Sequence, residues 1–270
     1  MSFTPGGLLL PYYVGVGEVL ESEGVLVRGE TPLAGSSVGA LAAALLCTPH
    51  LSYPEMLDAC RDLMGELRGQ RPTYLGRVEQ VLRPWLDSVL PPDVHERANG
   101  CGVSVAVTRL KDMQPLRVSE FTSKQDLVDS VVTSCFIPGY LAPARGLEFR
   151  DHGTCLDGMP TCFSPDTCTL DGIGVETTMT TLRVCATPAT AMGWLGLLED
   201  KTDNSVTKID ISPDVRGMGS ADTFSEWVRL TWLGLVPYSD AECISLHRDG
   251  IADAQAWIRS ADAKRTLARM

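Results

Sequence analysis

The hydrophobic positions of the chain follow two different periods. Apolar residues recur every three or four positions between Leu10 and Gly24, which predicts a helix that ends at the glycine. Valines at 103, 105 and 107 alternate with smaller residues, which predicts a strand. The same reasoning predicts further strands near 25–35, 115–121, 146–151 and 180–188, and further helices near 38–47, 52–67, 75–90, 123–136, 221–235 and 239–261.

Strands that alternate with helices indicate an α/β fold with a mainly parallel central sheet between helices. Two sequence signatures of helix starts, Ser52 with Glu55 and Ser239 with Glu242, have the spacing of capping boxes. Pro84 predicts a break or kink in its helix. No Gly-, Ser- or Pro-rich linker divides the chain, so we expect residues 1–270 to form one domain whose C-terminal part, about 220–270, is helical.

Composition and charge narrow the class of partner. The chain has 270 residues, of which 44% are hydrophobic and 21% charged, so it can bury a core of its own. Its formal net charge of -11 argues against nucleic acid as a partner, because phosphate binding needs clustered Lys and Arg. Neutral lipids and small esters remain compatible with this charge.

The nine cysteines are irregularly spaced and form no C-x-x-C pair, so we expect no zinc site. Several lie in apolar runs, which favours free thiols and a reducing compartment; the alternative is one disulfide among Cys155, Cys162 and Cys168. We see neither a signal peptide nor an apolar run long enough to cross a membrane. The expected location is therefore intracellular, either cytoplasmic or peripheral to a lipid surface.

The stretch PLAGSSVGALAAALL, residues 32–46, contains a G-x-S-x-G pattern formed by Gly35, Ser37 and Gly39. A strand, a sharp turn and a helix would present the serine as a nucleophile, with helix N–H groups to stabilise an oxyanion. The alternative is a helix start made of small residues. Gly6 and Gly7 also precede a predicted helix, where they form either an anion-binding loop or a plain turn.

A serine nucleophile needs a base. His247 has the chain order of an α/β-hydrolase triad, but only about thirty residues precede the serine, too few for the strands that come before it in that fold. An aspartate within hydrogen-bond reach can serve instead, and Asp151 and Asp157 both lie beside turn residues. The alternative for each is a solvated turn residue.

Three blocks of the sequence together resemble the patatin-like phospholipases, especially the adiponutrin-like acylglycerol lipases. The blocks are SFTPGGLLLPYYVGV at 2–16, GSSVGAL at 35–41 and SCFIPGYLAPARGLEFRDHGTCLDGMP at 134–160. The resemblance extends over about residues 2–190. It implies a three-layer α/β sandwich and hydrolysis of lipid esters through an acyl-enzyme, with no metal or organic cofactor. The implied partner is a lipid or acyl ester, and a membrane or lipid-droplet surface is a further candidate.

The resemblance also implies roles for single residues. Ser37 corresponds to the nucleophile, Gly6 and Gly7 to the oxyanion glycines, and Asp151 to the catalytic aspartate, with Asp157 as the second candidate. The chain departs from the family pattern at His152, which replaces a glycine, and at Leu10, where a glycine is expected; one extra residue also separates Asp151 from DGMP. Lipid transacylation and a catalytically impaired lipid-binding homologue remain the alternatives.

Overall fold

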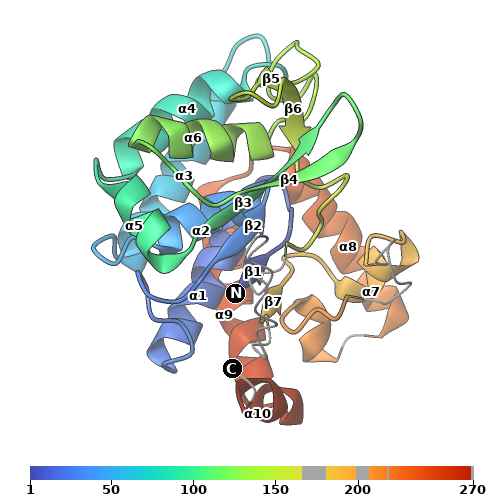
Figure 1. Ribbon diagram of the computed structural model, residues 1–270. Helices are drawn as coiled ribbons and strands as arrows, with labels where there is room; N and C mark the ends of the chain where they lie inside the picture. Colours follow the sequence, from blue (N-terminus) through green and yellow to red (C-terminus); the bar gives the residue numbers. More distant parts are fainter. Residues whose placement is uncertain (166–180, 199–206, 218, 269–270) are drawn as a thin grey trace.

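The computed structural model of the protein describes residues 1–165, 181–198, 207–217 and 219–268 (Figure 1). It confirms the α/β class: a central sheet is flanked by helices, with α2 to α6 on one side and α7 and α8 on the other in the view of Figure 1. The strands are β1 (Ser2–Phe3), β2 (Ala34–Ser36), β3 (Ser104–Arg109), β4 (Gln114–Val118), β5 (Leu147–Glu148), β6 (Thr154–Asp157) and β7 (Arg183–Val184). The helices are α1 (Leu10–Ser22), α2 (Val38–Leu46), α3 (Tyr53–Gly69), α4 (Val78–Val89), α5 (Val94–Cys101), α6 (Lys124–Ser134), α7 (Ala189–Trp194), α8 (Ser220–Leu235), α9 (Asp240–Ile258) and α10 (Ala261–Leu267), with a 3-10 turn at Pro213–Arg216.

The sheet is parallel through its centre and antiparallel at one side. Its order is β5-β6-β3-β2-β1-β7, and β4 pairs with β3 outside this path. The neighbours β7, β1, β2 and β3 are parallel, whereas β3 pairs antiparallel with both β4 and β6. The parallel pairs β1–β2 and β2–β3 are joined through helices, as a parallel connection requires.

The register of β3 brings the ends of β2 and β6 together. Ser36, the last residue of β2, lies opposite Ala106, while Asp157, the last residue of β6, lies opposite the next residue, Val107. The other edge of β3 is paired with β4 along the same stretch. Because a strand has only two edges, β2 and β6 share one edge and meet end to end at Ala106 and Val107.

The larger of two hydrophobic clusters among the described residues joins both ends of the chain. It includes residues from Met1 to Ala263, and α9 packs along α1. The hydroxyl group of Tyr12 on α1 donates a 2.8 Å hydrogen bond to the buried Asp253 carboxylate on α9.

Most predicted elements are confirmed, including both capping boxes, at Ser52 and at Ser239. Three details differ. The expected strand at 25–35 is limited to Ala34–Ser36, because the residues before it form turns. Pro84 lies inside the continuous helix α4. The helices α5 and α7 and the strand β6 were not predicted.

Seven of the described cysteines, all but Cys162, are free thiols and are buried. The alternative was one disulfide among Cys155, Cys162 and Cys168; Cys155 is one of the free thiols, and Cys168 lies outside the described residues. Among the described residues, no group of His, Cys, Asp and Glu side chains could hold a metal ion. Nor does any helix there have the length and apolar character needed to cross a membrane.

Candidate active site

Ser37 occupies a strained turn between β2 and α2. Its backbone has φ 56° and ψ -129°, which an L-residue adopts only when its surroundings enforce it. Its carbonyl oxygen accepts the N–H of Ala40 at 2.8 Å, which starts the helix. The side chain is almost fully buried, with 4% exposed. The predicted strand, sharp turn and helix are therefore confirmed.

Both glycines of the motif are required by close backbone packing. A Cβ added at Gly39 would lie 2.1 Å from the carbonyl oxygen of Phe3, and one added at Gly35 would lie 2.1 Å from the Gly39 carbonyl group. Neither neighbour is a flexible side chain, so any larger residue would displace β1 or α2. This explains the spacing around the serine by steric fit alone.

The carboxyl group that meets Ser37 belongs to Asp157. The end-to-end junction of β2 and β6 places Asp157 next to the turn, where the Ser37 side chain is close enough to its carboxyl group to lower the pKa. The Met159 N–H donates a 2.7 Å hydrogen bond to Oδ1 of the same group. Burial raises the pKa of Asp157 to about 6, and the Met159 N–H and the Ser37 side chain act in the opposite direction.

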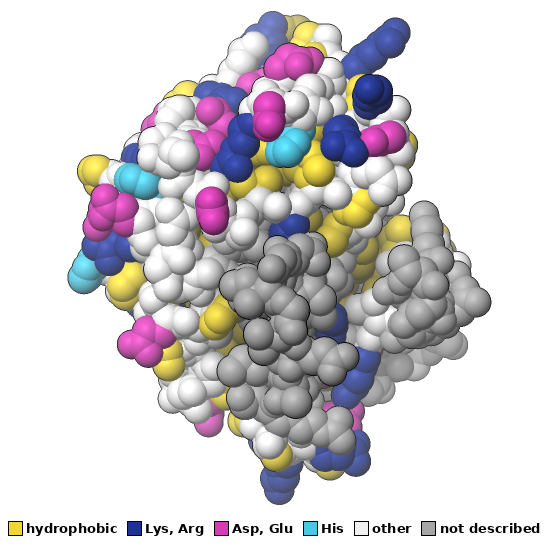
Figure 2. Space-filling model, in the orientation of Figure 1, with side chains coloured by type: hydrophobic (Ala, Val, Ile, Leu, Met, Phe, Trp, Pro, Cys, Tyr) yellow, Lys and Arg dark blue, Asp and Glu magenta, His cyan; other side chains and the backbone are white. Residues whose placement is uncertain are grey.

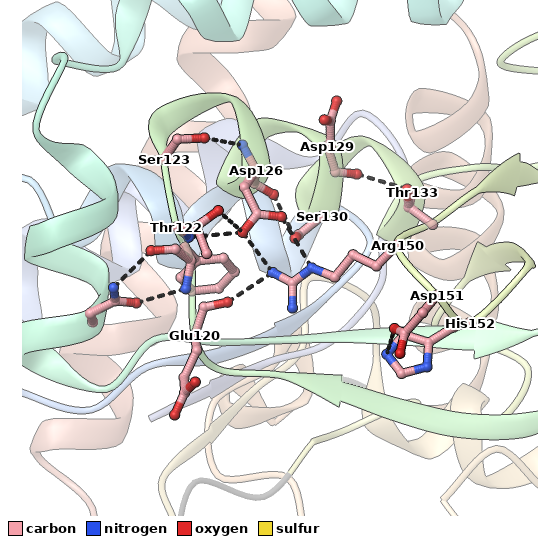
Figure 3. Close-up of polar contacts among 12 residues, drawn as sticks. Glu120, Thr122, Ser123, Asp126, Asp129, Ser130, Thr133, Arg150, Asp151 and His152 are labelled. Atoms are coloured by element: carbon pink, nitrogen blue, oxygen red, sulfur yellow. Dashed lines mark hydrogen bonds and ion pairs between the residues drawn. The ribbon is translucent and has the colours of Figure 1, made fainter.

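Asp151 lies elsewhere, which corrects the expectation that it faces Ser37. It is in the turn between β5 and β6, at the other end of β6 from Asp157. Its side chain is 91% exposed and lies 3.7 Å from the His152 ring (Figure 3). Acidic, basic and histidine side chains crowd this surface around the β5–β6 hairpin (Figure 2). The physical reason is the unpredicted strand β6, which separates the two aspartates.

The loop before α1 carries Gly6 and Gly7. A Cβ added at Gly6 would lie 3.4 Å from the side chain of Val38, the residue that follows Ser37 in the chain. Gly7 has φ 61°, and a Cβ there would lie 2.0 Å from the carbonyl oxygen of Gly234 on α8. Within the described part of the chain the Gly7 N–H donates to no acceptor. Among the described residues the N–H groups of Val38 and Gly39, at the start of α2, likewise have no acceptor.

A small cavity of about 40 Å³ opens beside Ser37. Gly7, Ser37 and Cys135 contribute to its wall, and the rest is apolar: Leu8, Leu10, Val38, Leu41, Leu63, Met64, Leu67, Val78, Leu82, Ile137 and Tyr140. Leu10, the departure from the family pattern, begins α1 and lines this cavity. An apolar wall around a buried serine suits an acyl chain better than a polar substrate.

The Cys135 thiol is a second nucleophile in the same wall. It lies against the Ser37 hydroxyl group, and burial raises the pKa of the thiol well above its usual range. It therefore stays protonated and unreactive at neutral pH. His247, whose chain order suggested a triad, instead pairs with Glu18 on α1 at 3.0 Å. A larger depression of about 910 Å³ between α3 and α4 has charged walls, including Asp58 and Arg61, and does not reach Ser37.

Sequence comparisons confirm the resemblance to patatin-like phospholipase domain proteins. Patatin-like phospholipase domain-containing protein 2 from Mus musculus is 32% identical over 171 residues, which covers 59% of this chain and 34% of the relative. The mouse 1-acylglycerol-3-phosphate O-acyltransferase Pnpla3 is 32% identical over 179 residues, covering 63% and 42%. The human omega-hydroxyceramide transacylase is 32% identical over 173 residues, covering 60% and 31%. No family model matches the chain.

The chain spans only about a third to two fifths of the length of these relatives. Among solved structures, VipD from Legionella pneumophila matches with a TM-score of 0.42 and 12% sequence identity, covering 95% of this chain and 66% of that one.

Proposed function

Because the chain is homologous to patatin-like phospholipase domain proteins, we propose that it is a lipid acyl hydrolase with a Ser37–Asp157 dyad. The observation that carries this proposal is the buried Asp157 carboxyl group at the end of β6, beside a serine on a strained strand-to-helix turn. Sequence reasoning favoured Asp151 for this role, and the geometry supports the second candidate instead.

In the proposed mechanism the Ser37 hydroxyl oxygen attacks the acyl carbonyl carbon while Asp157 accepts the hydroxyl proton. The N–H groups of the Gly6–Gly7 loop and of the α2 N-terminus stabilise the oxyanion of the tetrahedral intermediate. Collapse of the intermediate releases the alcohol, which takes the proton back from Asp157, and leaves an acyl-enzyme. Water then attacks the acyl carbonyl carbon while its proton passes to the same carboxylate. The bond to the Ser37 oxygen breaks, that oxygen takes the proton from Asp157, and the fatty acid is released.

Transacylation is the second candidate, because the names of two relatives describe an acyltransferase and a transacylase. The same acyl-enzyme would transfer its acyl group to the hydroxyl group of a second lipid instead of water. Incubation of the protein with a labelled acyl donor and a lysolipid or diacylglycerol acceptor distinguishes the two: labelled fatty acid indicates hydrolysis, and labelled acceptor indicates transfer.

A lipid surface is the proposed partner, and α8 is the element that supports it. Four exposed apolar side chains, Phe224, Val228, Trp232 and Leu235, follow one another at helical spacing along its outer face. The stripe ends beside the cavity, because the Tyr140 hydroxyl group, at the cavity wall, donates a 2.9 Å hydrogen bond to the Leu235 carbonyl oxygen. The stripe itself carries no basic residue, and with a net charge of -11 this favours an uncharged lipid surface.

Reaction with a fluorophosphonate probe tests the nucleophile. We expect wild-type protein to be labelled at Ser37 and to hydrolyse a soluble short-chain ester. Ser37→Ala should lose both properties at unchanged thermal stability, since alanine fits the same small site. Ser36→Ala is the matched control, because Ser36 is the neighbouring buried serine. Ester hydrolysis by a folded Ser37→Ala protein, or an unlabelled and inactive wild type, would exclude the proposed dyad.

A further inference from the structure

Ser134 links the nucleophile turn to the sheet. It is the last residue of α6 and is fully buried. Its hydroxyl oxygen accepts the N–H of Ser37 at 2.8 Å, and its hydroxyl group donates to the carbonyl oxygen of Ala106 at 2.6 Å. The Ser134 side chain thus connects the turn at Ser37 to Ala106, the residue of β3 that lies opposite the last residue of β2.

The same short segment also holds the aspartate. The N–H of Asp157 donates to the Phe136 carbonyl oxygen at 3.0 Å, and the N–H of Gly158 donates to the Ser134 carbonyl oxygen at 3.3 Å. The backbone of residues 134–136 therefore fixes the end of β6, while the Ser134 side chain fixes the turn after β2. This segment therefore contacts both the turn that carries Ser37 and the strand end that carries Asp157.

The turn needs such a link. Ser37 has a left-handed φ of 56°, a conformation that an L-residue retains only when its neighbours hold it. β2 and β6 share no hydrogen-bond ladder with each other, and their ends are aligned only through β3. Ser37 lies one residue beyond β2, outside that ladder, so sheet pairing alone does not hold its backbone.

We infer that Ser134 is a positioning residue for the reaction: its hydroxyl group holds Ser37 where the nucleophile meets Asp157. This inference rests on the proposed Ser37–Asp157 dyad. Ser134 touches no reacting atom in this scheme and takes part in no proton transfer. It acts on the rate through the Ser37 backbone.

The test compares Ser134→Ala with Ser130→Ala. Ser130 lies one turn earlier on α6, is equally buried, and donates a 2.7 Å hydrogen bond to the Asp126 carbonyl oxygen within its own helix (Figure 3). Each variant removes one buried hydroxyl group, and Ser134→Ala should lose more thermal stability because it leaves the Ser37 N–H without its acceptor. Activity is therefore compared below the unfolding transition of both variants. Only Ser134→Ala should lose activity on a soluble ester.

For Ser134→Ala we expect kcat to fall by about 10- to 100-fold with KM changed by less than about threefold, because misplacement of a reacting group by about 1 Å costs about 100-fold. The rate of fluorophosphonate labelling at Ser37 should fall with kcat. The acidic limb of the pH profile should also move to higher pH, since displacement of Ser37 takes away from Asp157 a neighbouring hydroxyl group that lowers its pKa. If Ser134 had only a structural role, kcat, the labelling rate and the acidic limb of the folded variant would stay unchanged.

Two further variants keep the inference falsifiable. Ser134→Thr retains the hydroxyl group and should recover labelling if it folds. Ser134→Cys fills the same space with a weak hydrogen-bonding group and should be impaired even if Ser134→Ala does not fold. Labelling of folded Ser134→Ala or Ser134→Cys at the rate of Ser130→Ala would overturn the role of Ser134 while leaving the dyad intact. A wild-type protein that is neither labelled nor active would overturn both.

Discussion

At the residue scale, Asp157 combines burial with contact to the serine. Burial raises the pKa of its carboxyl group to about 6, so the group is still mostly ionised at neutral pH. This pKa is close to the value that suits a general base at that pH. Asp151, 91% exposed in a turn, has neither property. The two aspartates differ by six positions in sequence and by the full length of β6 in space.

Asp157→Asn should therefore abolish most of the activity, and Asp151→Asn should not. The amide keeps the shape and the contact from the Met159 N–H but cannot accept a proton, so we expect a loss of about 10²- to 10⁴-fold in kcat. Asp151→Asn is the matched control, with an expected change of less than about twofold. Steady-state kinetics on a soluble ester measure both. The reverse ranking would restore the sequence-based choice of Asp151.

Activity should fall as the pH drops through about 6, because protonated Asp157 cannot accept the serine proton. A pH profile of kcat/KM measures the midpoint. A flat profile between pH 5 and 8 would contradict Asp157 as the base.

Thermal unfolding is the control for this pH profile. The folded state binds the Asp157 proton more tightly than the unfolded state, whose pKa is 3.8. The contribution of this group to stability is therefore fully present below about pH 4 and is lost as the pH rises through about 6. Asp157→Asn should remove this slope, and the acidic loss of activity should not coincide with unfolding caused by this residue.

At the element scale, α8 has two different faces. Leu230 and Leu233 are buried in the core, whereas Trp232 is 65% exposed and Phe224 is 54% exposed on the outer face. The inner face agrees with a core helix and the outer face with an interfacial helix. Its C-terminal end also positions the glycine loop, because the Leu8 N–H donates to the Gly234 carbonyl oxygen at 2.9 Å.

Trp232→Gln should reduce action on emulsified neutral lipid several-fold and leave hydrolysis of a soluble ester unchanged. The reason is that an exposed tryptophan gains much of its burial free energy only at a lipid surface. Val27→Gln is the control, since Val27 is 46% exposed and lies outside α8. Parallel assays on the emulsified lipid and on the soluble ester measure the two effects. Equal losses on both substrates, or none on either, would show that the stripe does not contact lipid.

At the scale of the whole molecule, the C-terminal helices are part of the core that supports the site. Beyond the Tyr12–Asp253 hydrogen bond, Arg216 approaches the Asp253 carboxylate at 2.6 Å, and the Tyr238 hydroxyl group donates to the Leu8 carbonyl oxygen at 2.5 Å. The loop that contains Gly7 is therefore held between α1 and the last helices. The N-terminal glycine loop and α1 belong to the part of the chain that resembles the family. They pack against C-terminal residues that lie outside that resemblance.

Local patterns were enough to predict much of this architecture. The capping boxes at Ser52 and Ser239, the helix after Ser37 and the strand β3 follow from interactions within a few residues, which sequence alone specifies. The glycine spacing around Ser37 likewise predicted the turn, because the steric demand of a sharp strand-to-helix turn is local.

By itself, then, the sequence determined the α/β class, the position of Ser37 on its turn and the similarity to patatin-like proteins. Only the tertiary structure decided which aspartate faces the serine. The residues of β6, TCLD at 154–157, show no strand pattern strong enough to outweigh the turn residues on either side. They form a strand because they pair with β3, more than forty residues earlier in the chain. The role of Ser134 likewise could not be predicted from the sequence, because a hydrogen bond between residues 97 positions apart leaves no periodic pattern in the chain.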